Sequence, residues 1–105
     1  MKKIASKDNQ YIKQAISLKN RKYRTREQMF LLEGKTMVSE ALQSKHPLVR
    51  VLVDEAYREE YQALYEQFNH LQWLEIESRL FKTIADTETP QGIIAVAPIP
   101  RTDFE

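Results

Sequence analysis

Basic residues gather around one aromatic side chain in the first third of the chain. Residues 19–26 read Lys-Asn-Arg-Lys-Tyr-Arg-Thr-Arg, so five of these eight residues are basic. Guanidinium groups bind phosphate oxygens in a bidentate geometry, and a tyrosine ring can stack on an unpaired base. This combination predicts a surface that binds the backbone of RNA. The side chains to which we assign RNA contact are Lys13, Lys19, Arg21, Lys22, Tyr23, Arg24 and Arg26.

The same composition also suits a solvated basic connector that only keeps the protein in solution, and the distribution of charge bears on this alternative. Residues 1–35 hold ten Lys and Arg against three acidic residues, a net charge of +7. Residues 36–105 hold six basic and twelve acidic residues, a net charge of −6. The overall charge of +1 is therefore an average. We expect a positive field on one side of the molecule, which favours an anionic partner.

Other residues that could do chemistry lack the partners that the chemistry needs. Asp86 and Glu88 have the spacing of a general acid and base, but Asp and Thr in this segment are also typical side-chain caps of a turn. His46 and His70 stand alone next to predicted helix ends, without the spacing of metal ligands. No serine lies in the sequence context of a catalytic nucleophile. We therefore predict no catalytic residue, no metal and no bound cofactor in this chain.

The composition restricts the class of protein further. The chain has 105 residues, 42% of them hydrophobic and 30% charged, which predicts one small domain. It has no cysteine, which excludes disulfides and thiolate zinc sites. Its two glycines, Gly34 and Gly92, are too far apart for a glycine-rich phosphate loop. The sequence contains neither a signal peptide nor a membrane span, so we expect a cytoplasmic protein that has no membrane partner.

Hydrophobic periodicity predicts strands that alternate with helices. The expected helices are 8–19, 35–44, 55–69 and 79–85, the expected strands are 29–33, 48–53, 71–76 and 92–97, and 20–27 and 86–92 are a polar connector and a turn. Asp54 and Ser78 are predicted caps of the third and fourth helices, and Thr25 of a short helical turn in the connector. The predicted fold is a small three-layer α/β/α sandwich with a mostly parallel four-stranded sheet.

Aromatic residues concentrate in the third predicted helix and the strand after it. Their helical spacing indicates that most of them belong to the core, whereas Tyr65 lies off the stripe and is expected to be partly exposed. An exposed aromatic patch there would be an interface. The alternative function is therefore a protein-interaction or dimerisation module in which the basic loop is incidental. The aromatic residues concerned are Tyr57, Tyr61, Tyr65, Phe68 and Trp73.

Several motifs occur together in a characteristic order. They are Arg21-Lys-Tyr-Arg24, Phe30-Leu-Leu-Glu-Gly34, Val38-Ser-Glu-Ala-Leu42 and, at 86–96, Asp-Thr-Glu-Thr-Pro-Gln-Gly-Ile-Ile-Ala-Val. Across essentially its whole length the chain resembles the N-terminal substrate-binding domain of the SpoU (TrmH) family of RNA ribose 2'-O-methyltransferases. One departure is Gln28-Met29 before Phe30, where relatives often have a glycine, and it concerns only the conformation of that loop.

The resemblance implies a fold shared with ribosomal and kink-turn RNA-binding proteins, and a division of the parent enzyme into domains. Residues 1–97 would be the RNA substrate-binding domain, and 98–105 the start of an interdomain linker. A knotted catalytic domain that binds S-adenosylmethionine would follow Glu105. The parent would be an S-adenosylmethionine-dependent methyltransferase that acts on RNA, with ribosomal RNA as the expected substrate, and a homodimer through that domain. This chain alone would be monomeric, non-catalytic and bound to RNA.

Overall fold

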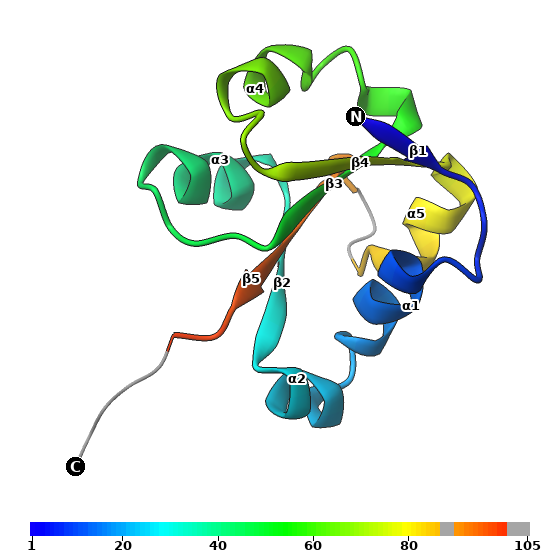
Figure 1. Cartoon of the computed structure of the whole chain (residues 1–105). Helices are drawn as coiled ribbons and strands as arrows, with labels where there is room; N and C mark the ends of the chain where they lie inside the picture. The colour runs from blue at the N-terminus through cyan, green and yellow to red at the C-terminus, as the bar shows by residue number, and fades with distance from the viewer. Residues whose placement is uncertain (87–89, 101–105) are drawn as a thin grey trace.

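The computed structural model describes residues 1–86 and 90–100, and in these ranges five strands form one mixed sheet (Figure 1). The strand order is β1-β4-β3-β5-β2. β1 pairs with β4 and β4 with β3 in parallel, whereas β5 pairs with β3 and with β2 in antiparallel. Four strands therefore point in one direction and β5 alone in the other. The strands are β1 (Lys2–Ile4), β2 (Met29–Glu33), β3 (Arg50–Asp54), β4 (Gln72–Ile76) and β5 (Ile93–Pro98).

The prediction of a mostly parallel four-stranded sheet was wrong in two respects. It missed β1, because this strand has three residues, two of them lysines, and only Ile4 is buried. It also missed the direction of β5, because a hydrophobic run does not specify which way a strand points. The chain returns after the last helix to the edge where β3 ends, and there the Asp54 amide donates a 2.9 Å hydrogen bond to the Gly92 carbonyl.

Helices cover both faces of the sheet, which confirms the three-layer arrangement (Figure 1). α1 and α5 pack on one face, where Ile12 and Phe81 lie in a cluster with Leu52 of β3. α3 and α4 lie over the other face, where Val38 and Tyr61 belong to a separate cluster. The helices of the described residues are α1 (Gln10–Ser17), α2 (Arg21–Glu27), α3 (Lys35–Gln43), the 3-10 helix η1 (Glu55–Tyr57), α4 (Gln62–Gln67) and α5 (Ser78–Ile84). None of them has the length and apolar character needed to cross a bilayer.

Two predicted segments differ from the structure in their helices. The connector 20–27 is mostly helix α2, which buries none of its residues and so has no apolar period in its sequence. The predicted helix 55–69 is instead η1 followed by the short helix α4. Asp54 caps η1 as predicted, since its carboxylate accepts a hydrogen bond from the Ala56 amide. The capping residue of α5 is Glu77 rather than Ser78, which is the first residue of the helix.

The sheet has two edges at which loops and helix ends gather. We call the edge where β2, β3 and β4 begin the amino edge, and the edge where they end the carboxyl edge. The amino edge carries α2, the loop 44–49 before β3 and the loop 68–71 before β4. The carboxyl edge carries the turn at Gly34, η1 and the segment Pro90 to Gly92. The predicted basic cluster therefore lies at the amino edge.

Candidate nucleic-acid interface

Local capping explains why a fully polar segment forms helix α2. The Asn20 side chain accepts a hydrogen bond of 2.9 Å from the Lys22 amide at the start of the helix. The helix ends at Gln28, which adopts a left-handed conformation with φ 57°. Its side-chain amide donates to the Thr25 carbonyl at 2.7 Å. Gln28 therefore takes the backbone conformation that glycine adopts most easily, at the position where the sequence departs from the family pattern.

The basic side chains of this region fall into two groups, and the first is exposed. Lys13, Arg21 and Lys22 are exposed and form no ion pair with any residue in 1–86 or 90–100. The Arg26 guanidinium lies 4.6 Å from the centroid of the half-buried Tyr23 ring, a cation–π contact that holds it over the helix. Arg26 also pairs with Glu27 at 3.4 Å, an exposed contact of little energy. These charges can meet an anionic ligand.

The second group has a structural role that the sequence did not reveal. Nη1 of Arg24 donates hydrogen bonds of 3.0 and 2.9 Å to the carbonyls of Leu18 and Lys19 at the end of α1. The Lys19 ammonium donates to the Thr83 carbonyl at 3.1 Å and pairs with Asp86 at 3.0 Å. Both side chains satisfy carbonyls near helix ends, which otherwise lack partners. Arg24 and Lys19 therefore have less freedom to bind a ligand than their neighbours on α2.

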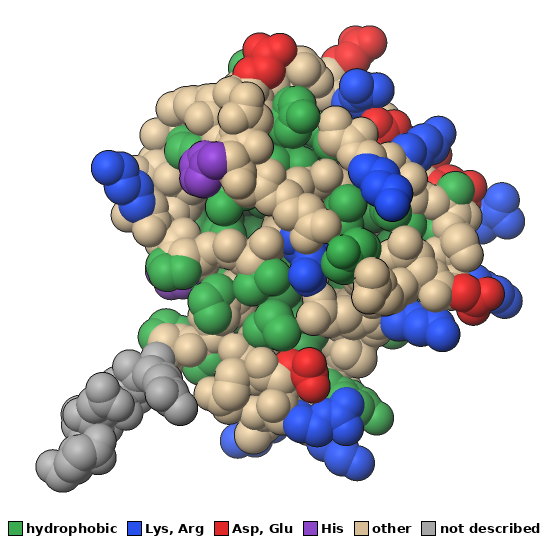
Figure 2. All heavy atoms as spheres, viewed as in Figure 1, with side chains coloured by type: hydrophobic (Ala, Val, Ile, Leu, Met, Phe, Trp, Pro, Cys, Tyr) green, Lys and Arg blue, Asp and Glu red, His purple; other side chains and the backbone are tan. Residues whose placement is uncertain are grey.

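Ion pairs also reduce the charge separation seen in the sequence. Lys3 pairs with Glu55 at 2.9 Å and Lys35 with Glu60 at 3.6 Å, so basic residues of the first 35 contact acids of the later segment. Figure 2 shows basic and acidic side chains interspersed along one side of the molecule. The positive field is therefore weaker over the carboxyl edge than the +7 of residues 1–35 suggests.

Arg50 adds a charge at the amino edge that sequence reasoning missed. Its guanidinium lies 4.6 Å from the centroid of the Tyr11 ring, and its Nε donates to Gln72 at 3.0 Å. Nη1 donates to the side chain of Gln14. Partial burial lowers the pKa of Arg50, but a guanidinium keeps its charge at neutral pH. A single arginine within a hydrophobic strand carries no functional signal in the sequence, so only the fold identifies this fixed cation.

The described part of the segment 86–92 is tied into the carboxyl edge by hydrogen bonds. Oε1 of Gln91 accepts a 2.7 Å hydrogen bond from the Lys35 amide and so supplies the cap for the start of α3. The Tyr61 hydroxyl donates to the Gln91 carbonyl. The Asp86 amide donates to the Glu33 carboxylate at 2.8 and 2.9 Å. These contacts give the turn a structural role, whereas Thr87, Glu88 and Thr89 lie outside the described residues.

Both glycines are covered by neighbouring side chains. Gly34 has φ 105°, and a Cβ there would lie 3.1 Å from Oε1 of Gln91. Gly92 has φ 76°, and a Cβ there would lie 2.3 Å from Cγ of Tyr57. Neither glycine belongs to an open loop that could cradle phosphates. Within the same residues no three His, Asp or Glu side chains gather as metal ligands do.

Comparison with known proteins identifies the family. Residues 9–95 match the family described as the MRM3-like substrate binding domain. The chain belongs to this family. The MRM3-like domain is the N-terminal part of SpoU/TrmH rRNA 2'-O-methyltransferases, in agreement with the resemblance seen in the sequence.

Individual relatives of this MRM3-like domain are longer proteins. It is 34% identical over 100 residues to the 23S rRNA (guanosine(2553)-2'-O)-methyltransferase RlmP of Bacillus subtilis (strain 168), covering 95% of this chain and 39% of that protein. A crystal structure of an RNA 2'-O ribose methyltransferase is 33% identical, with a TM-score of 0.80 over 98% of this chain and 40% of that one. The SpoU methyltransferase AviRb from Streptomyces viridochromogenes, solved with the cofactor AdoMet, shares the fold at 24% identity, with a TM-score of 0.71 over 90% of this chain and 35% of that one. The chain thus spans about two fifths of the first two relatives.

Proposed function

We propose that this domain binds RNA, ribosomal RNA in particular, and presents it to the catalytic part of a 2'-O-ribose methyltransferase. The observation that carries the proposal is the position of the exposed basic helix α2. The Ile99 amide donates a 2.9 Å hydrogen bond to the carbonyl of Gln28, directly after α2. The described chain therefore leaves the sheet beside the end of α2, and a domain that follows the proposed linker 98–105 would be tethered on the side of the molecule that carries α2.

In this proposal the methyl transfer takes place in the domain that follows this one. S-adenosylmethionine would supply the methyl group there, and the ribose 2'-hydroxyl would accept it. This chain would increase the rate by holding the RNA close to the cofactor in the correct orientation, which replaces a bimolecular encounter by a local one. Residues 1–97 would form the RNA-binding domain and 98–105 would begin the linker. A ribosomal RNA substrate agrees with the cytoplasmic location that we expect.

The packing of the aromatic residues supports RNA binding over a dimerisation module. Tyr61 is 2% exposed and Trp73 is 4% exposed, so both belong to the core. Tyr65 is half-buried, as predicted, and its ring packs edge-on against Trp73 with the centroids 5.6 Å apart. Among the described residues the exposed large hydrophobic side chains are Ile16 and Met37, which lie on different helices. Within residues 1–86 and 90–100 this arrangement offers no broad aromatic patch for a second copy of the chain.

Salt dependence measures the contribution of the exposed cations. Contacts from Lys13, Arg21, Lys22 and Arg26 to four phosphates would give a slope of log affinity against log salt of about −2.8 to −3.6. The test compares the wild type with the double variant Arg21→Ala/Lys22→Ala, titrated with a ribosomal RNA stem-loop over a salt series. We expect the affinity to fall about tenfold and the slope to become less steep by about 1.4 to 1.8.

A matched control separates a specific interface from a general charge effect. Lys7 and Lys82 are exposed and form no ion pair among the described residues. The double variant Lys7→Ala/Lys82→Ala removes the same charge away from α2, and we expect it to keep the wild-type slope. Equal losses in both double variants, or no loss in either, would contradict the proposal. Arg24 is left intact because its guanidinium supports the end of α1.

A further inference from the structure

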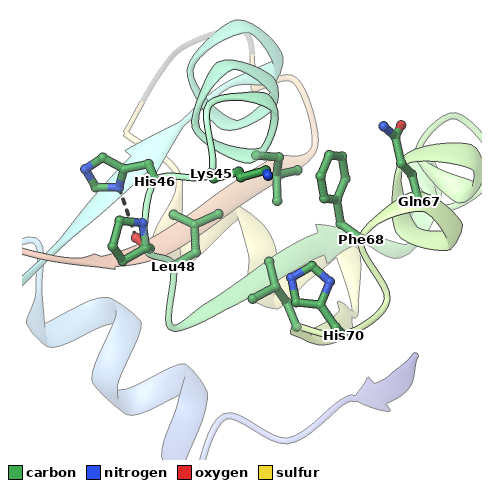
Figure 3. Close-up of a pocket in the computed structure, with 9 residues that line it drawn as sticks. Lys45, His46, Leu48, Gln67, Phe68 and His70 are labelled. Atoms are coloured by element: carbon green, nitrogen blue, oxygen red, sulfur yellow. Dashed lines mark hydrogen bonds between the residues drawn. The ribbon is translucent and has the colours of Figure 1, made fainter.

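A cavity at the amino edge has a lining that the basic helix does not explain. It has a volume of about 440 Å³ and lies between the loop that follows α3 and the loop that follows α4 (Figure 3). Apolar side chains, among them Leu42, Leu48 and Leu71, make much of its wall, and its polar groups are basic or neutral. None of the lining residues is acidic. The complete lining is Leu42, Lys45, His46, Pro47, Leu48, Gln67, Phe68, His70 and Leu71.

The shape and chemistry of this cavity suit a flat, uncharged ring that is linked to a negatively charged group. Figure 3 shows Phe68 and His70 on one side of the hollow, with Lys45 and Leu48 across it. The Phe68 and His70 rings are tilted by 56°, with their centroids 6.5 Å apart. Aromatic and apolar walls bind unpaired bases by stacking, which tolerates any base, and a nearby ammonium binds the phosphate. The volume falls within the usual range of small-ligand sites.

The backbone conformation of Lys45, and not a contact of its side chain, places this residue at the rim of the cavity. It has φ 61°, a left-handed conformation that glycine or asparagine adopts at lower cost than lysine. The Lys45 amide donates to the Leu42 carbonyl at 3.2 Å, and the His46 amide to the Ala41 carbonyl at 2.9 Å, which fixes the turn at the end of α3. Its exposed ammonium forms no ion pair in the described part of the chain. A lysine here costs stability and leaves a free cation beside the cavity.

The topology places this cavity on the same edge as α2. The loops that line it lead into the starts of β3 and β4, and α2 leads into the start of β2. The order β4-β3-β5-β2 separates these starts by two or three strand spacings, about 10 to 15 Å. Arg50, the first residue of β3, lies at the same edge, with its guanidinium against Tyr11 and Gln14 of α1. One RNA strand can therefore reach both α2 and the cavity.

We propose that this cavity binds one unpaired base of the RNA, with the phosphate of that nucleotide on the ammonium of Lys45. The proposal rests on the proposed function, because it specifies where a single-stranded part of the same RNA is held. It also extends that function, since α2 contacts phosphates, which carry no sequence information, whereas a cavity for a base requires an unpaired nucleotide. An RNA with a loop or bulge is therefore bound in preference to a continuous duplex.

The experiment uses a single-stranded RNA oligonucleotide with one 2-aminopurine, whose fluorescence falls when the base stacks on an aromatic ring. Lys45→Asn removes the charge and suits the left-handed backbone, and Phe68→Leu keeps an apolar side chain but removes the ring. Lys82→Asn on α5 is the matched control. We expect the wild type and the control to quench the fluorescence, Phe68→Leu to lose most of the quenching, and each pocket variant to bind about fivefold to tenfold more weakly.

Each outcome supports or overturns the inference. The base site is overturned if both pocket variants bind the oligonucleotide and quench its fluorescence as the wild type does. If Arg21→Ala/Lys22→Ala still weakens binding of the stem-loop in that case, the proposed function remains intact. Failure of the wild type to bind either RNA contradicts both. The amide chemical shifts of Lys45 and His70 give a further test. The base site is also overturned if a blunt RNA duplex or inorganic phosphate alone changes these shifts as much as the single-stranded oligonucleotide does. If Phe68→Leu lowers the melting temperature, Lys45→Asn and His70→Ala, both changes of exposed residues, decide the test.

Discussion

The two edges of the sheet use polar residues in opposite ways. At the carboxyl edge the Asp54 carboxylate, 6% exposed, accepts hydrogen bonds from the Ala56 amide and from the Ser78 hydroxyl at 2.6 Å. Gln91 caps α3 there. At the amino edge Arg21, Lys22 and Lys45 extend into solvent without an ion pair among the described residues. The carboxyl edge satisfies its polar groups internally, whereas the amino edge leaves cations available to a ligand.

If RNA binds at α2 as proposed, a motif that carries the family resemblance and the binding surface lie in different parts of the molecule. The segment 86–92 is one of the motifs that carry the family resemblance, yet its described contacts hold strands, α3 and η1 together. Helix α2 has a simple, highly charged composition and no buried residue, yet it has the freedom to bind phosphates. Substitutions at the carboxyl edge should therefore change stability, and substitutions of exposed cations at the amino edge should change binding. Four further predictions test this separation.

The largest effect is expected at Gly92. A Cβ in Gly92→Ala would lie 2.3 Å from Cγ of Tyr57, on a backbone with φ 76° that an L side chain rarely adopts. Crowding and backbone strain together should lower the free energy of unfolding by about 3 kcal/mol. Urea denaturation measures this loss. RNA affinity of the folded fraction should remain that of the wild type, and an unchanged denaturation midpoint would contradict the close packing of Gly92 against Tyr57.

Arg24 refines the comparison, because it is a basic residue of the amino edge with a structural role. Arg24→Ala removes two hydrogen bonds to carbonyls near the end of α1, so the free energy of unfolding should fall by about 1.5 kcal/mol. Arg21→Ala, on the same helix, should leave it unchanged within about 0.5 kcal/mol. Thermal denaturation of both variants compares the two. Equal stability would show that Arg24 is as free as its neighbour.

Gln91 tests the carboxyl edge with a smaller change. Gln91→Ala removes the acceptor for the Lys35 amide at the start of α3, and the loss of this cap should cost about 1 kcal/mol. Amide hydrogen exchange should become faster in the first turn of α3. The salt slope of RNA binding should stay that of the wild type, and a flatter slope would place RNA contacts at this edge as well.

The smallest effect is expected from Glu55, in the way the free energy of unfolding depends on pH. The Ser78 amide and the Lys3 ammonium hold the pKa of Glu55 below its ordinary value of 4.5. A carboxyl group with a lowered pKa stabilises the fold above about pH 4.5 and loses this contribution as the pH falls through the folded-state pKa. In Glu55→Gln the free energy of unfolding should therefore fall less steeply than in the wild type as the pH is lowered from 6 to 3. Denaturation from pH 6 to pH 3 measures it, and Glu59→Gln is the exposed control.

Prediction from the sequence succeeded where local patterns control the structure. The strand 29–33 and the helix 35–44 match β2 and α3 closely, because a short apolar run and a helical period are local signals. β1 was missed because its three residues are stabilised only by pairing with β4. α2 was missed as a helix because its capping at Asn20 and Gln28 is not accompanied by an apolar face. The assignment of RNA contacts to seven residues stays a prediction, and the structure divides those residues by what else they contact.

The sequence by itself determined the layered α/β class, the family and the position of the basic cluster, because residue types, hydrophobic periods and motif order are written along the chain. The tertiary structure decided which cations remain available, since the carbonyls that bind Arg24 and Lys19 come from the ends of other helices. It also decided that β5 runs against its neighbours. Finally, it brought the loops before β3 and β4 together into a cavity on the edge that carries α2, because loops that precede strands of the same direction meet at one edge of a sheet.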